Sequence, residues 1–545
     1  MDLNDIKVIV IGSGVCGALV AYKLAKQHHK VLIIEAGPDK TDRLAFAGSF
    51  ATSIEKGPGS PYRNAGPGYI VGPDNDANYY EQTTPDVFKS TFVRVAGGST
   101  WHFLGNVPRF VPSDFRLKEK YNIAQDWPID YDTLEPYYGE SERELGVAGD
   151  HHEWDGYLGA HRSAPYPMNK VWQSYGDQIF LQKADQATVD NRTIKIMSTP
   201  QARNSTIYDG RPACAGNSTC VPICPIQAKY DATVHINKAK SLGAIMYANC
   251  VVKKLDADEN GRIVRLTYFD MKSKTEVELD TKDKIVVLAA HAIETPRLLL
   301  YSGLAKKSGQ VGKNLMDHLQ GYCVALAPQP VYPFRGPLTT SGIDVFRDGE
   351  SRREFAAFRM SIGNDGWGRI ESPITTLWDN LNAGVYGTQL RNNIRERVIR
   401  MVRISFSTEM LPQEKNAVTL SEDKKDPLGI PRPRLSFYFD DYNKKAMQYA
   451  YNVSTQVMEL AGCTVVHEKA QVKQYSGAGH IMGTTRMGRD AETSVVNDYG
   501  QTHEHPNLFI AGPSVFVTSG TANPTLTATA LSLRTADKLH SLLTS

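Results

Sequence analysis

The sequence feature that most constrains the fold is a glycine-rich turn near the N-terminus, which reads GSGVCG from Gly12 to Gly17. It follows a short apolar run, Lys7 to Ile11, and it opens a stretch with helical spacing of apolar residues up to Lys26. A second β-branched run then ends at Glu35. Strand, tight turn, helix and strand in this order predict the first unit of a parallel sheet covered by helices, an α/β fold.

Each glycine of this Gly-x-Gly-x-x-Gly pattern has a structural role that a larger residue could not fill. Gly12 permits the tight turn, Gly14 lets a pyrophosphate approach the backbone, and Gly17 lets the helix pack closely on the strand. The helix N-terminus stabilises phosphate charge, and Glu35 can accept hydrogen bonds from ribose hydroxyls. The alternative is a packing turn without a ligand. The motif predicts a bound dinucleotide and leaves open whether it is NAD or FAD.

Charge and hydropathy exclude several classes of protein. The 545 residues contain 61 Lys and Arg against 59 Asp and Glu, so the net charge of +2 gives no basic footprint for nucleic acid. Seven cysteines are too few for a disulfide scaffold. No apolar run is long enough to predict a membrane-spanning helix. The uncharged stretch from Val8 to Tyr22 resembles a signal peptide, but Asp2 and Asp5 precede it where basic residues are expected, and the dinucleotide turn explains it better.

Four further segments narrow the class of dinucleotide protein. RVAGGSTWHFLGNVPRF starts at Arg94, AAHAIETPRLLLYSG at Ala289 and GHIMGTTRMG at Gly479, and NLFIAGPSVFVTSGTANPTLTATALSLRTADKL starts at Asn507. Together with the N-terminal turn they resemble the glucose–methanol–choline (GMC) family of FAD-dependent oxidoreductases. The segment PQARNSTIYDGRPACAGNSTCVPICPIQAKYD, from Pro200, is most similar to the large subunits of bacterial glucose, fructose and gluconate dehydrogenases.

The resemblance implies a fold and a set of cofactor contacts. We expect an FAD-binding domain with a parallel sheet and a three-stranded meander, interleaved with an antiparallel-sheet substrate domain. The FAD-binding domain is predicted at 1–48, 200–320 and 476–545, and the substrate domain at 49–199, with a flavin-contacting loop at 94–110, and at 321–475. The cofactor-binding residues implied are Gly12, Gly14, Gly17, Glu35, Gly97, Gly98, Ser99, His102, Ala511 and Gly512.

A histidine and an asparagine near the C-terminus are the predicted catalytic pair. Oxidation of an alcohol needs a base near the hydroxyl, and histidine suits that role at neutral pH. His480 lies between glycines, and Asn523 follows in GTANPTL. By resemblance, His480 is the base and Asn523 orients the substrate hydroxyl. Some family members carry a second histidine where this chain has Asn523, so proton abstraction falls on His480 alone.

His102 raises a separate question about the cofactor. It lies four residues after Gly98, at a place where some sugar oxidases of the family attach FAD covalently through a histidine. The alternative is a histidine that packs near the flavin without a bond.

Three cysteines form a cluster in the sequence. Cys214, Cys220 and Cys224 lie within eleven residues, and Pro225 follows at once. Closely spaced cysteines followed by proline are typical of iron–sulfur ligands, and three thiolates suit a three-iron four-sulfur (3Fe–4S) cluster. The similar dehydrogenase subunits carry such a cluster in this segment, although Ala215 stands where they often have another cysteine. Zinc would need a fourth ligand, and a disulfide with one free thiol is the other alternative.

These features together predict an FAD-dependent sugar or polyol dehydrogenase that passes electrons through the cluster to an external acceptor. An O₂-using sugar or glycoside oxidase without a cluster is the alternative, and a non-catalytic flavoprotein subunit is a remote one. The resemblance implies a small subunit and a cytochrome or quinone acceptor. It also implies a periplasmic enzyme held at the membrane through its partners, whereas a chain acting alone would be cytoplasmic.

Overall fold

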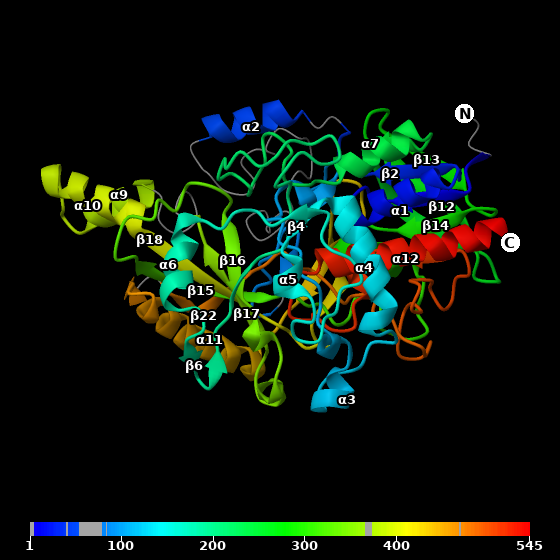
Figure 1. The fold of residues 1–545 in the computed structure, drawn as a ribbon. Coiled ribbons are helices and arrows are strands. Elements are labelled where there is room, and N and C mark those ends of the chain that lie inside the picture. The colour runs from blue at the N-terminus through cyan, green and yellow to red at the C-terminus, as the bar shows by residue number, and fades with distance from the viewer. Residues whose placement is uncertain (1–4, 40–41, 54–78, 83, 366–372, 468–469) are drawn as a thin grey trace.

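The structure, a computed structural model, describes residues 5–39, 42–53, 79–82, 84–365, 373–467 and 470–545. Two sheets dominate it. In Figure 1 the parallel sheet and its helices lie to the right, and a larger antiparallel sheet lies to the left.

The parallel sheet has the strand order β10-β2-β1-β14-β23. All its neighbours run parallel, and Ile9 of β1 is paired with Leu32 on one side and Val286 on the other. β1 and β2 are buried along their whole length, as expected for strands covered on both faces. The strands are β1 (Val8–Ile11), β2 (Val31–Glu35), β10 (Ile245–Ala248), β14 (Ile285–Leu288) and β23 (Leu508–Ile510).

Helices from distant parts of the chain cover this sheet. α1 packs against both α12 and α7, and α12 also packs against α4. The first half of α12 is buried on nearly every side, because it runs beneath α1 and α4 (Figure 1). The helices are α1 (Val15–Lys26), α4 (Tyr131–Leu145), α7 (Thr233–Ser241), α8 (His291–Ser302) and α12 (Thr525–Thr544).

The predicted three-stranded meander is present. Its strands β11 (Cys250–Ala257), β12 (Ile263–Asp270) and β13 (Thr275–Asp280) pair antiparallel in sequence order. The meander follows β10 directly and returns the chain to β14, the next strand of the parallel sheet.

The second large sheet has seven strands, and all its pairs are antiparallel. α11 (Asp441–Leu460) packs on its outer face (Figure 1). Its strands are β8 (Ile196–Ser198), β15 (Leu319–Leu326), β16 (Thr339–Ile343), β17 (Phe358–Gly363), β18 (Met401–Thr408), β21 (Thr464–Val465) and β22 (Gln471–Gly477). The α/β class with a Rossmann-like sheet and an antiparallel sheet is therefore confirmed, while the domain boundaries stay predictions.

Shorter elements connect these bodies. The remaining helices are α2 (Arg43–Thr52), α3 (Leu117–Tyr121), α5 (His151–Trp154), α6 (Tyr175–Lys183), α9 (Pro373–Asn382) and α10 (Gly387–Arg400). The remaining strands are β3 (Glu81–Gln82), β4 (Val147–Gly149), β5 (Met168–Asn169), β6 (Thr188–Val189), β7 (Arg192–Thr193), β9 (Gln201–Ala202), β19 (Ala417–Lys425) and β20 (Pro431–Ser436). Within the described ranges, no helix combines the length and the apolar character needed to cross a bilayer.

Candidate active site

A cavity of about 640 Å³ lies where the carboxyl ends of the parallel strands meet the antiparallel sheet. This edge of an open α/β sheet is where ligands of such folds bind. The cavity brings together nearly all the predicted cofactor and catalytic residues, although they are spread over 500 positions of sequence. Its walls include residues 11–16, 34–36, 89–94, 98–100, 102–106, 221, 250–253, 289–291, 476–481, 511–514 and 523–525.

The N-terminal turn forms one end of this cavity. A Cβ atom on Gly17 would lie 2.1 Å from the carbonyl oxygen of Gly12, so the close contact of helix and strand excludes any side chain there. A Cβ atom on Gly14 would meet nothing within 4 Å, because this face of the turn opens into the cavity. The backbone at Gly14, at the N-terminus of α1, is thus exposed to whatever the cavity holds.

Glu35 is buried at the same end, and its carboxylate has three protein donors. The backbone N–H and the hydroxyl of Ser13 donate to one oxygen, at 2.9 and 2.6 Å. The N–H of Gly37 donates to the other oxygen at 2.7 Å. A carboxylate has about four lone-pair sites, so Glu35 retains acceptor capacity towards the cavity that it lines.

The predicted flavin-contacting loop crosses the middle of the cavity. Gly97 donates its N–H to the Ser13 hydroxyl at 3.3 Å, which ties the loop to the N-terminal turn. Gly98, Ser99 and His102 line the cavity. Burial lowers the pKa of His102 to about 4, so the imidazole is neutral.

Lys229 holds this loop from behind. Its ammonium group donates to the carbonyl oxygens of Thr100, Trp101 and Phe103, at 3.0, 2.9 and 2.8 Å. The lysine is buried, and burial lowers its pKa to about 8. Three hydrogen bonds from one charged group fix the backbone of the loop against the cavity.

Ala511 and Gly512 close the cavity from the far side of the sheet. They follow β23, and the N–H of Ala511 donates to the carbonyl oxygen of Leu288 at 2.8 Å, which extends the parallel ladder by one bond. Both residues line the cavity.

The residues present fit FAD. An elongated dinucleotide needs a backbone turn free of side chains at its pyrophosphate, an acidic group for its ribose, and room for a large aromatic ring system. Gly14, Glu35 and the loop at Gly97–Gly98 provide these along one continuous cavity. When bound, FAD would supply an acceptor for the hydride of an alcohol.

His480 and Asn523 meet at the other end of the cavity. Asn523 Nδ2 lies 3.1 Å from His480 Nε2, and both residues line the cavity. His480 follows β22 at the edge of the antiparallel sheet, whereas Asn523 directly precedes α12 of the parallel-sheet body. The pair thus forms only where the two bodies join.

His318, just before β15, determines which nitrogen of His480 carries the proton. His318 Nε2 lies 3.0 Å from the carbonyl oxygen of Gly520, which can only accept, so Nε2 carries the hydrogen. Burial lowers the pKa of His318 to about 4, so its Nδ1 is an acceptor. His480 Nδ1 lies 2.9 Å from that atom and must donate to it. The Nε2 of His480 then carries a lone pair, which accepts a hydrogen bond from Asn523 Nδ2.

Electrostatics keep His480 in this neutral form. Burial, followed by the proximity of His318 and Arg359, holds the pKa of His480 well below its usual value. Its backbone N–H donates to Asp317 Oδ1 at 3.0 Å, and burial raises the pKa of Asp317 to about 7. His480 therefore offers an unprotonated base at neutral pH.

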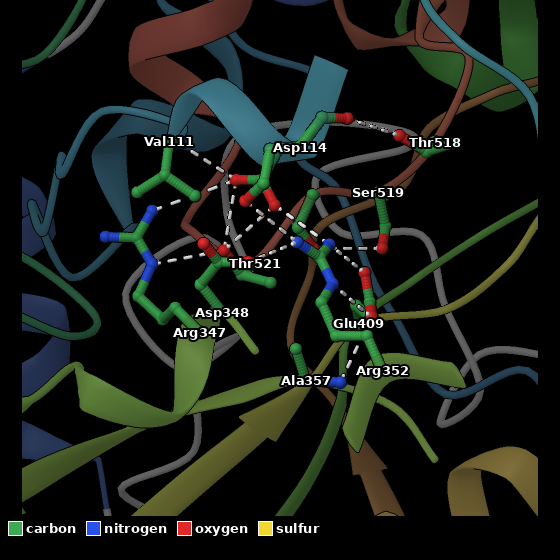
Figure 2. Close-up of polar contacts among 12 residues, drawn as sticks. Val111, Asp114, Arg347, Asp348, Arg352, Ala357, Glu409, Thr518, Ser519 and Thr521 are labelled. Atoms are coloured by element: carbon green, nitrogen blue, oxygen red, sulfur yellow. Dashed lines mark hydrogen bonds and ion pairs between the residues drawn. The ribbon is translucent and has the colours of Figure 1, made fainter. Parts of the chain in front are cut away.

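A buried ion network holds the segment 518–523, which ends at Asn523, the predicted catalytic asparagine. Asp114 accepts from Arg352 Nη2 and from Thr521 Oγ1, both at 3.0 Å. Arg352 also donates twice to Glu409, at 3.0 and 2.6 Å. Figure 2 shows these charged groups gathered around Ser519 and Thr521, and all of them are buried.

The cysteine cluster lies beside the cavity, and Val221 between its members lines the cavity wall. Cys214, Cys220 and Cys224 are all free, so the disulfide alternative is not observed. Burial raises the pKa of the Cys214 thiol. Across the described part of the chain, no three histidine, cysteine or carboxylate side chains are gathered to hold a metal ion. The conformation of this loop thus presents no ready-made site for an iron–sulfur cluster or for zinc.

Sequence reasoning missed three residues that contact the predicted site: His318, Lys229 and Arg359. His318 ends the segment VGKNLMDH, which also carries the family resemblance but gives no local sign of a role in hydrogen bonding. Lys229 and Arg359 are buried charges, and burial cannot be read from an isolated basic residue.

Comparisons with known proteins agree with this geometry. Residues 185–320 and 412–532 match the two models of the GMC oxidoreductase family, and residues 10–41 match a model of an NAD(P)-binding Rossmann-like domain. The chain is 35% identical to the fructose dehydrogenase large subunit of Gluconobacter japonicus, with 98% of this chain and 97% of that protein covered. It is 28% identical to the 2-methyl-1,2-propanediol dehydrogenase of Mycolicibacterium austroafricanum, with 97% and 94% covered.

A solved structure shows the same fold. Pyridoxine 4-oxidase from Mesorbium loti superimposes with a TM-score of 0.66 at 19% identity, with 98% of this chain and 99% of that chain covered. The match along the full length of the fructose dehydrogenase subunit places the chain within one family. The chain therefore belongs to the GMC oxidoreductase family, and it is an FAD-dependent enzyme that oxidises alcohol or sugar CH–OH groups.

Proposed function

We propose that this enzyme is a dehydrogenase that oxidises one hydroxyl of a sugar or polyol to a carbonyl. One observation carries the proposal. Asn523 Nδ2 donates to the lone pair of His480 Nε2 at 3.1 Å on the wall of the cavity, and a substrate hydroxyl would replace this bond. An alcohol hydroxyl is complementary to this pair, because it donates one hydrogen bond and accepts another.

The chain's own residues would act as follows. The substrate O–H donates to His480 Nε2, and its oxygen accepts from Asn523 Nδ2. His480 takes the hydroxyl proton as the hydride leaves the carbinol carbon, and the C–O bond becomes a carbonyl. The resulting imidazolium keeps its Nδ1–H bond to His318, which stays neutral and orients the ring.

The substrate class is proposed from the relatives. The two dehydrogenases reported above are named for a sugar and for a diol. The polar residues Lys89, Ser90 and Gln320 also line the cavity. Polar side chains on the cavity wall can form hydrogen bonds with additional hydroxyls of the substrate. This favours polyols over simple alcohols.

Anaerobic mixing with a panel of substrates tests this proposal. Ketoses, aldoses, sugar acids and short diols are each added to the FAD-loaded enzyme, and bleaching of the flavin absorbance is followed by stopped flow. We expect at least one polyhydroxy compound to reduce the flavin faster than a monohydric alcohol of similar size. Reduction by monohydric alcohols alone would contradict the assignment to sugars or polyols.

We also propose that Cys214, Cys220 and Cys224 hold a 3Fe–4S cluster that serves an external electron acceptor. The support is the cysteine spacing, the following Pro225, and the contact of their loop with the cavity at Val221. As folded, the three thiols do not form a group that could hold a metal ion, so the proposal rests on spacing and resemblance.

Iron and sulfide analysis decides this point. We expect an anaerobic preparation to contain iron and acid-labile sulfide, and Cys220→Ser to lose most of both while FAD stays bound. The matched control is Cys463→Ser, a buried cysteine far from the cluster in sequence, which should leave the iron content unchanged. An anaerobic preparation without iron would make the cysteines structural and would favour the O₂-using oxidase.

Partners and location follow from the same proposal. One relative is the large subunit of its dehydrogenase, which supports a small subunit here. A cytochrome or quinone acceptor and a periplasmic, membrane-associated location belong with that assembly. The non-catalytic flavoprotein alternative has less support, because a scaffold would need neither His480 nor Asn523.

A further inference from the structure

We propose that Arg359 is the positioning residue that fixes which way the Asn523 amide faces, and with it the nitrogen of His480 that receives the substrate proton. The inference rests on the proposed function of the His480–Asn523 pair. Arg359 lies on β17 of the antiparallel sheet and is buried. Its Nη1 donates to Asn523 Oδ1 at 3.1 Å.

The orientation of the Asn523 amide follows from the fact that a guanidinium group can donate hydrogen bonds but cannot accept them. Arginine has only donors, so the atom of Asn523 that faces Arg359 must be the amide oxygen. The amide nitrogen is thereby turned towards His480 Nε2. If the amide were flipped, its oxygen would face the lone pair of His480, and the substrate oxygen would lose its donor.

A chain of hydrogen bonds runs from the Gly520 carbonyl through His318, His480 and Asn523 to Arg359. The groups at its two ends require the same direction of donation along it. At one end the Gly520 carbonyl can only accept, which assigns the protons through His318 to His480 Nδ1. At the other end Arg359 can only donate, which leaves Nδ2 of Asn523 facing Nε2 of His480. Two independent termini thus select one tautomer of His480, in which Nε2 is the base.

The guanidinium group of Arg359 is also bonded to the carboxylate of Asp344. Arg359 Nε donates to Asp344 Oδ1 at 3.2 Å, and Arg347 Nη1 donates to the same oxygen at 3.3 Å. A Cβ atom on Gly342 would lie 3.0 Å from Arg359 Nη2, so the glycine leaves the space that the guanidinium occupies. Arg347 Nε also donates to Thr521, which connects Arg359 to the segment that carries Asn523.

The positive charge of Arg359 also affects the pKa of His480, so its removal should change how the reaction rate depends on pH. Together with burial and His318, it lowers the pKa of His480. Removal of the charge should raise that pKa, so the acid limb of the rate profile should move to higher pH. The other charged and titratable groups around His480 are Asp317 and His318, with Asp114 and Arg347 behind His318.

The experiment compares Arg359→Gln and Arg359→Lys with the unchanged enzyme, each loaded with FAD. We expect Arg359→Gln to lower the rate constant of flavin reduction by about 10- to 100-fold, the usual effect of losing a charged hydrogen bond, and to move the acid limb upward. Arg359→Lys keeps the charge and should keep the limb in place, while the rate recovers only in part. The matched control is Arg403→Gln on the neighbouring strand, where the arginine pairs with Asp365. This variant should change neither the rate constant of flavin reduction nor the position of the acid limb.

A double-mutant cycle asks whether Arg359 acts through Asn523. In an Asn523→Ala background, Arg359→Gln should lower the rate constant at the pH optimum by less than about 2-fold, because the amide it positions is gone. A further loss as large as in the unchanged enzyme would overturn the proposal. So would a slow Arg359→Gln variant whose acid limb does not move, since a merely structural role lowers the rate without shifting a pKa.

A measurement without substrate separates this inference from the proposed function. The His480 imidazole is titrated by NMR in ¹⁵N-histidine-labelled protein and identified by its absence in His480→Gln. In Arg359→Lys the resonance should titrate as in the unchanged protein, and in Arg359→Gln at higher pH. If no sugar or polyol reduces the flavin, the proposed function fails, while an unshifted titration in Arg359→Gln overturns the role of Arg359.

Discussion

Replacing His480 by alanine is expected to lower the rate constant of flavin reduction by about 10²- to 10⁴-fold, the usual contribution of a general base. The FAD content should stay the same, because the residues that fit the cofactor lie mainly on the N-terminal turn and the 97–102 loop. The effect is large because His480 Nε2, which lies 3.1 Å from Asn523 Nδ2, is the proposed acceptor of the hydroxyl proton. Anaerobic stopped flow with the best substrate of the panel measures it.

Two variants make this result specific. Asn523→Ala should cost only about 10-fold, because it removes a neutral hydrogen bond and not the proton acceptor. His503→Ala is the control, since His503 bonds to Ser494 and does not line the cavity. Near-normal flavin reduction in His480→Ala would show that another group takes the proton.

The second large effect concerns stability. Arg352→Met should lower the free energy of unfolding by about 3–5 kcal/mol, the cost of leaving buried carboxylates without their partner. Arg352 is fully buried and bridges Asp114 and Glu409 (Figure 2). Because proteins are stable by only about 5–15 kcal/mol, such a loss is a large part of the whole. Urea unfolding, followed by tryptophan fluorescence at a fixed FAD concentration, measures it.

The adjacent residue provides a matched control for this prediction. Arg353 pairs with Glu350, and their side chains are 46% and 77% exposed. Arg353→Met should therefore change the unfolding free energy by less than about 1 kcal/mol, as is usual for surface ion pairs. Equal destabilisation by the two variants would show that the buried network contributes no more than a surface pair.

Much of the fold could be predicted from local sequence because its signals are local. One short stretch of sequence contains the Gly12–Gly17 turn, the β-branched runs around it and Glu35. Their spacing alone therefore indicates a strand, a helix and a dinucleotide-binding site. The same holds for the motifs around His480 and Asn523, which indicated a catalytic pair by resemblance. The cysteine spacing indicated ligands in the same way, but as folded the three thiols do not form a group that could hold a metal ion.

What only the tertiary structure decided is how the predicted catalytic pair is oriented. His318 is 162 residues from His480, and Arg359 is 164 residues from Asn523. Their contacts depend on how the antiparallel sheet, which carries Arg359 on β17, joins the segment before α12. The sequence determined which residues can donate or accept a proton. The direction of the hydrogen bonds was decided by packing, because a histidine tautomer depends on which neighbours the folded chain brings within about 3 Å of each nitrogen.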